Sequence, residues 1–124
     1  MTQGAKDDWH QVIAERRLAV LPEGEVRIGI EAPVPAPGGD WQCRLHITGL
    51  SAEIIRDAVG VDGIQAIWAA MSMAASYVYA SDLYRAGHLI FSRDSEPVKG
   101  SLFLPLQESL TDLVPVEGFR RYAY

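Results

Sequence analysis

The chain has 124 residues, of which 48% are hydrophobic and 22% are charged, as in an ordinary globular protein. This length predicts a single domain over residues 1–124, with residues 1–8 and the last few residues frayed. The formal net charge of −5 argues against a nucleic-acid partner, because such binding depends on phosphate neutralisation. Cys43 is the single cysteine, which excludes an intrachain disulfide and a thiolate metal cluster. The N-terminus shows no basic region followed by an apolar run, so we expect a cytoplasmic, bacterial-type protein without a cofactor.

Alternating apolar and polar residues predict three antiparallel strands in the first part of the chain, over residues 10–21, 26–32 and 41–48. Arg16 falls on the inward face of the first strand. Either a β-bulge turns it outward, or it is buried and needs a carboxylate. The proline-rich residues 33–40 predict an extended loop.

Three later segments carry weaker strand signals. Residues 51–60 fit either a short helix begun by Ser51 or a fourth strand, and the run of hairpin-linked strands favours the strand. Residues 88–92 are short and β-like. Residues 102–106 are apolar but interrupted by Pro105, which predicts an edge strand or an extended covering segment.

One long helix is predicted between Gly60 and Gly87, because residues 63–81 contain no charge. Asp62 can cap its first turn, and Gln65 can reach back to the cap amide. With Gly87 at its end the helix would span about 37 Å. Its serines, tyrosines and Gln65 argue against a membrane span.

Two faces of this helix differ in size. The bulky face is predicted to meet the core and contains Ile64, Ile67, Trp68, Met71, Ala75 and Val78. The opposite face is small, aromatic and uncharged, and its candidate self-association residues are Ala66, Ala70, Met73, Tyr77 and Tyr84. Together these features predict an α+β fold, in which an antiparallel β-meander of three to five strands carries one long helix on one face.

Three short motifs support a resemblance over roughly residues 10–93: IAER at 13–16, WQC at 41–43 and GVDGIQA at 60–66. They resemble a family of small, uncharacterised bacterial domains of unknown function, which implies no activity. The meander-and-helix outline is also similar to small immunity proteins that neutralise bacterial toxins.

Candidate chemistry is sparse. The three histidines are too far apart in sequence for a metal-ligand pattern, and Cys43 alternates with core residues. Five residues are predicted to share the sheet face away from the helix: Arg17, Arg27, Glu31, Arg44 and His46. They fit either solvated cross-strand ion pairs or a basic patch for an anion or a partner.

The sequence favours a non-catalytic partner-binding protein of unknown process, with toxin immunity as one form. One alternative is a homodimeric accessory protein that associates through the small helix face. The other is a small-molecule or anion binder, or an enzyme, that uses the outer sheet face. The expected partner is a protein or a second copy of the chain, not a nucleic acid or a membrane.

Overall fold

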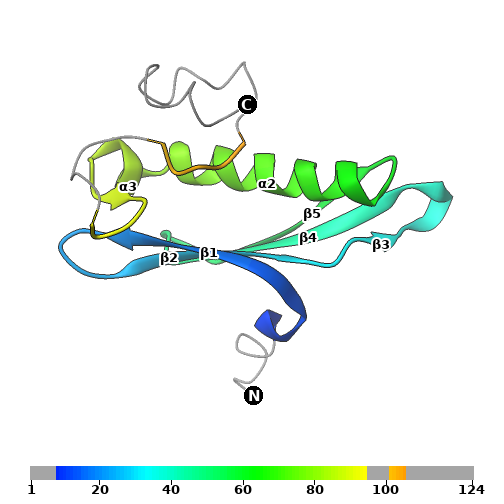
Figure 1. Cartoon of the computed structure of the whole chain (residues 1–124), viewed down its shortest axis with the longest axis horizontal. Coiled ribbons are helices and arrows are strands. Elements are labelled where there is room, and N and C mark those ends of the chain that lie inside the picture. The colour runs from blue at the N-terminus through cyan, green and yellow to red at the C-terminus, as the bar shows by residue number, and fades with distance from the viewer. Residues whose placement is uncertain (1–7, 95–100, 106–124) are drawn as a thin grey trace.

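The computed structural model describes residues 8–94 and 101–105, in which one antiparallel sheet of six strands carries a long helix on one face (Figure 1). The strands are β1 (Val12–Val20), β2 (Glu25–Glu31), β3 (Val34–Pro35), β4 (Trp41–Thr48), β5 (Ile54–Gly60) and β6 (Leu89–Ile90). The helices are α2 (Gly63–Tyr79) and α3 (Asp82–Arg85), with 3-10 turns η1 (Asp8–Gln11) and η2 (Pro37–Gly39). The predicted α+β class is confirmed, with one strand more than the upper limit predicted.

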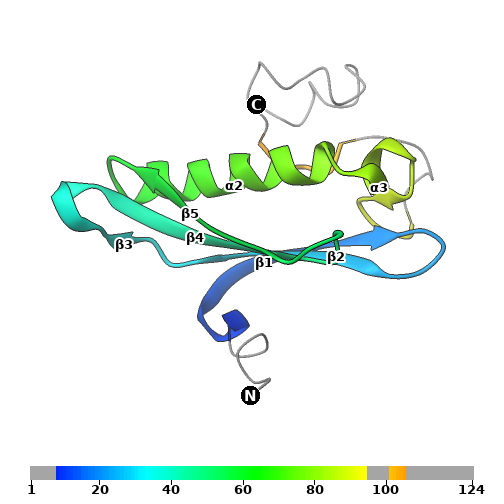
Figure 2. The same ribbon diagram turned by 180° about the vertical axis from the view of Figure 1, so that it is seen from behind.

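The strands β1, β2 and β4 contribute large apolar residues to the core, and β4 and β5 are the strands that α2 contacts most. The strand order is β3-β4-β2-β1-β6, and β5 pairs with the other side of β4. Cys43, Leu45 and Ile47 of β4 are wholly buried, as their alternation predicts. Strand β5 confirms the strand prediction for residues 51–60, and it lies at the edge of the sheet beside α2 (Figure 2).

Helix α2 meets the sheet through its small residues. Ala66, Ala70 and Ala74 are wholly buried, whereas Ile64 is 81% exposed and Trp68 is 49% exposed. The prediction that Ile64 and Trp68 face the core is therefore wrong. The strands already supply large side chains, so small residues on α2 allow the helix to approach them closely.

The start of α2 agrees with the predicted capping box. The Asp62 carboxylate accepts the Gln65 amide at 2.8 Å. The Gln65 side-chain oxygen accepts the Val61 amide at 2.6 Å, one residue before the predicted position. The first contact satisfies an amide that the first turn of α2 leaves free, and the second satisfies the amide of the residue before the cap.

The single helix predicted up to Gly87 is interrupted at Ser81. The Ser81 hydroxyl donates to the Val78 carbonyl at 2.6 Å and caps α3, so the chain turns between the two helices. The Arg85 guanidinium then donates to the Ala80 carbonyl at the end of α2. Gly87, with φ of 80°, follows α3. With 17 residues, α2 is about 25 Å long.

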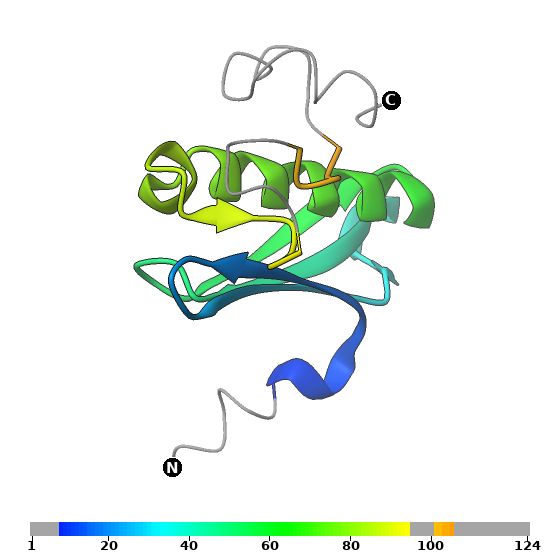
Figure 3. The same cartoon turned by 60° about the vertical axis from the view of Figure 1, so that its left-hand side comes forward.

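A short segment after β6, residues 101–105, lies beside α2 and adds Leu102 and Leu104 to the core, as a covering segment was predicted to do (Figure 3). Leu102 and Leu104 are buried, and the Leu102 amide donates to the Tyr79 hydroxyl at 2.7 Å. Arg16 is half-buried, but its guanidinium donates to the carbonyls of Leu102 and Phe103. The expected carboxylate partner of Arg16 is thus replaced by backbone oxygens.

Residues 1–7, 95–100 and 106–124 lie outside the described part of the chain, and so do the predictions of frayed ends that fall on them. In the described part, neither helix has both the length and the apolar character needed to cross a membrane.

Candidate functional site

The first candidate surface is the outer face of the sheet, opposite α2, where η1 folds back over the strands (Figure 1). Gly29 of β2 is paired with Glu15 on one side and with His46 on the other. The Trp9 ring lies directly on Gly29, because a Cβ atom there would be 2.5 Å from the ring atom Cζ3. Gly29 therefore forms the floor of a notch that holds an indole.

The walls of this notch come from three further side chains. The Arg27 guanidinium lies 4.0 Å from the centre of the Trp9 ring, in cation–π geometry. The His46 ring centre is 5.5 Å from that of Trp9. Val12 also borders this space, because its Cγ1 atom would lie 3.0 Å from a Cβ atom on Gly29. We call Val12, Arg27, Gly29 and His46 the Gly29 notch.

His46 is only 1% exposed, although its strand position predicts an outward side chain. Its Nε2 atom lies 2.7 Å from the Glu31 carboxylate. Its Nδ1 atom is buried and has no hydrogen-bond partner among the described residues. The ring is thus fixed on one side and unsatisfied on the other.

The arginines of the outer face are held by carboxylates. Arg17 and Arg27 both donate to Glu15, at 2.8 and 3.0 Å. These hydrogen bonds lower the pKa of Glu15 to about 2, and the bond from Arg27 has the largest effect. Arg44 binds Asp57 on β5 at 2.8 Å and lowers the pKa of that carboxyl group. This arrangement corresponds to the ion-paired alternative rather than to a free basic patch.

The second candidate surface lies along the junction of α2 and the edge strand β5. Three apolar side chains are exposed there: Val61 (69%), Ile64 (81%) and Trp68 (49%). We call these three residues the α2–β5 face. A groove of about 470 Å³ runs along it, lined by residues 57–59 of β5 and by Trp68, Ala69, Ser72, Met73 and Ser76 of α2.

Ser72 is the buried polar residue of this groove. Ser72 is only 4% exposed, and its hydroxyl has no hydrogen-bond partner within the described chain. A buried hydroxyl ordinarily donates to an acceptor, so the groove contains one polar group whose hydrogen bond is unsatisfied.

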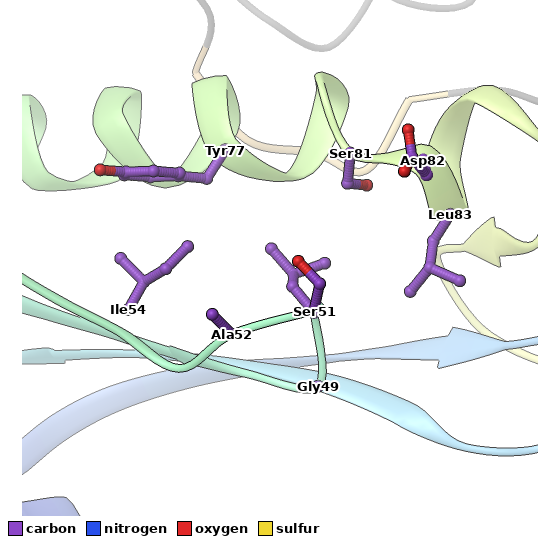
Figure 4. Close-up of a pocket in the computed structure, with 9 residues that line it drawn as sticks. Gly49, Ser51, Ala52, Ile54, Tyr77, Ser81, Asp82 and Leu83 are labelled. Carbon is purple, nitrogen blue, oxygen red and sulfur yellow. The ribbon is translucent and has the colours of Figure 1, made fainter.

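A third depression, of about 530 Å³, lies between the β4–β5 turn and the end of α2 (Figure 4). Ile54 and Ala52 on the strand side face Tyr77 and Ser81 on the helix side. The Ser81 hydroxyl is already engaged as a helix cap. The depression therefore offers a mainly apolar wall and few groups for chemistry.

Comparison with protein families finds a match to the family described as Domain of unknown function (DUF6968), over residues 14–100. The chain belongs to the DUF6968 family. Searches of curated proteins and of solved structures found no match.

The DUF6968 match includes β1 from Ala14 onward, the α2–β5 face and the depression of Figure 4. Arg27, Gly29 and His46 of the notch lie inside the matched range, whereas Trp9 and Val12 precede it. The indole that fills the notch is thus supplied from outside the matched part of the chain.

The predicted self-association residues of this DUF6968 domain are mostly buried inside it. Ala66, Ala70 and Tyr84 are covered within the chain and are not available to a second copy. Met73 lines the α2–β5 groove, and Tyr77 lines the depression of Figure 4. The small face is covered, as expected, but the sheet of the same chain provides the cover.

Cys43 behaves as the core residue that its position predicts. It is buried, its thiol donates to the Glu31 carbonyl, and burial raises its pKa. Nowhere in the described chain do three or more of His, Cys, Asp and Glu gather in a way that could hold a metal ion.

Trp9, Gly29, Val61 and Ser72 were not among the predicted site residues. A glycine in a strand interior often marks the close approach of another group, so Gly29 carried a usable signal. Ser72 and Val61 carried none, because their role depends on the position of α2 relative to β5.

Proposed function

We propose that this DUF6968 domain is a non-catalytic protein-binding module whose partner docks on the α2–β5 face. The observation that carries the proposal is the exposure of Ile64 and Trp68, one turn apart on α2. Exposed tryptophans surrounded by apolar residues are typical centres of binding energy in protein interfaces.

The geometry favours an extended apolar surface over a single exposed side chain. Trp68 lines a groove whose other wall is formed by residues 57–59 of β5. Ile64 is the i−4 neighbour of Trp68 on α2. A contiguous apolar surface of this kind commonly marks an interaction site.

Strand β5 adds a second means of recognition. Among the described strands it pairs with β4 alone, so its other edge has backbone groups that a partner strand could meet. A strand added there would run next to the groove, where the buried Ser72 hydroxyl needs a partner. Side chains of the added strand could then contact Trp68.

The alternatives receive less support from the described residues. An anion site on the outer face would have to displace the carboxylates that already bind Arg17, Arg27 and Arg44. Association through the small helix face would require Ala66 and Ala70 to leave the core. We further propose a bacterial cytoplasmic setting and, by outline alone, a toxin as the class of partner in an immunity role.

The test is affinity capture with three matched forms of the tagged full chain: the wild type, a face variant and a control. The face variant Ile64→Ser/Trp68→Ser removes the two large exposed side chains. The control Ile13→Ser removes an apolar side chain that is 61% exposed on β1 and lies outside the proposed surface. Circular dichroism establishes that each form is folded.

We expect the wild type and the Ile13→Ser control to capture the same protein, and the face variant to lose it. Equal capture by all three forms would contradict the proposal. Light scattering of the purified chain identifies self-association: a wild-type dimer that becomes a folded monomer in the face variant would show that the partner is a second copy.

A further inference from the structure

We infer that the Gly29 notch is a binding site for a planar aromatic ring of the indole class, and that Trp9 occupies it as an exchangeable plug. This inference is independent of the α2–β5 face, because the notch lies on the opposite face of the sheet from α2.

The shape of the notch depends on the missing side chain of Gly29. A single Cβ atom at this position would meet the Trp9 ring at 2.5 Å and Val12 at 3.0 Å. The Trp9 ring therefore occupies the space that the missing Cβ of Gly29 leaves open, and a single methyl group there would displace it.

The charge of the notch also favours an aromatic ring. The Arg27 guanidinium is held in place by two hydrogen bonds to Glu15, at 3.2 and 3.0 Å. It lies 4.0 Å from the Trp9 ring centre, so the cation faces the negative π surface without further rearrangement.

His46 specifies the polar part of the ligand. The Glu31 carboxylate accepts, so the Nε2 atom of His46 is the donor in their 2.7 Å contact. In the neutral ring, Nδ1 is then an acceptor, and it is buried without a partner in the described part of the chain. The Trp9 ring, whose centre lies 5.5 Å from that of His46, makes no hydrogen bond to this atom. A ligand whose ring carries an N–H group could donate a hydrogen bond to it.

Trp9 is suited to exchange because it reaches the notch from a short element. The turn η1 has four residues, and His10 and Gln11 beside Trp9 are exposed. A competing aromatic ring needs to displace one side chain from one glycine, with the strands unchanged.

The experiment uses free indole as the probe and the full chain with Trp9→Ala, which empties the notch as a cavity variant does. Indole is titrated while the melting temperature and the NMR signals of the His46 ring are followed. We expect saturable binding that raises the melting temperature and shifts the His46 signals. The wild type should bind indole at least about tenfold more weakly than Trp9→Ala does, because its site is free only when Trp9 has left. If Trp9→Ala does not fold, Trp9→Leu replaces it.

Three controls make the result specific. Trp68→Ala removes an exposed tryptophan elsewhere and should gain no affinity for indole. Trp9→Ala/Gly29→Ala fills the floor of the notch and should lose binding. The ligand 1-methylindole lacks the N–H group and should bind several-fold more weakly than indole.

Equal stabilisation of the wild type, Trp9→Ala and Trp68→Ala by indole would overturn the site, as would a folded Trp9→Ala that binds no indole. Binding that survives Gly29→Ala would overturn the notch as its location. Equal affinity for indole and 1-methylindole would overturn the assignment of His46 Nδ1 as the acceptor.

Discussion

Replacement of Ala70 by leucine tests the packing of α2 on the sheet. Ala70 is wholly buried where α2 lies over β4 and β5, so three additional carbon atoms have no space to enter. Overpacking of this kind typically costs about 1–3 kcal/mol, because neighbouring side chains or the backbone must shift. A cost of about 2 kcal/mol would lower the urea midpoint by about 1 M if the m value is about 2 kcal/mol/M.

Urea unfolding of Ala70→Leu, followed by circular dichroism, measures this cost directly. The matched control is Ile64→Ala on the exposed face of the same helix, which should change stability by less than about 0.5 kcal/mol. If Ala70→Leu were neutral and Ile64→Ala cost more than about 1 kcal/mol, the helix would be rotated and the packing described above would be refuted.

Three further predictions concern single contacts. Asp62→Ala should lower the free energy of unfolding by about 1 kcal/mol, measured by urea unfolding, because it frees first-turn amides of α2 without leaving a cavity. The stabilising contribution of Glu15, whose pKa is lowered from 4.5 to about 2, should be present above pH 4.5 and lost as the pH falls toward 2. This loss should be no more than about 1 kcal/mol, since the pair is partly exposed, and Glu15→Gln should abolish this part of the pH dependence. Tyr79→Phe leaves the buried Leu102 amide without its acceptor and should cost about 1–3 kcal/mol, with faster hydrogen exchange at Leu102; unchanged exchange would contradict the contact.

Local sequence patterns were sufficient for the longer strands, for the start of α2 and for the direction of the side chains of β4. Alternation placed Cys43, Leu45 and Ile47 inside and Arg44 outside, and the capping residue Asp62 located the start of the helix. These features depend on neighbours within a few residues, which the sequence shows directly.

The orientation of α2 could not be obtained in the same way. The usual rule assigns the bulkiest stripe to the core, whereas here Ile64 and Trp68 are exposed and Ala66 and Ala70 are buried. A helix that packs on large strand residues needs small ones at the contact, so its phase depends on the sheet beneath it. Likewise, the break at Ser81 arises from a cap that competes with helix continuation.

The outer face of the sheet also has features that the sequence predicts and features that it does not. The sequence placed Arg17, Arg27, Glu31, Arg44 and His46 on one side of the sheet, and the structure has them there. The buried His46 ring has the Trp9 ring 5.5 Å away between centres, and Trp9 comes from a separate element. No alternation pattern contains that contact.

The central claim, that a protein partner docks on the α2–β5 face, is tested most directly by site-specific photo-crosslinking in the cells that produce the protein. A photoreactive phenylalanine analogue replaces Trp68 in one form of the full chain and Ile13 in the control, since both positions are exposed. The account predicts a covalent adduct with one defined protein from position 68 and none from position 13. No adduct from position 68, or the same adducts from both positions, would contradict it.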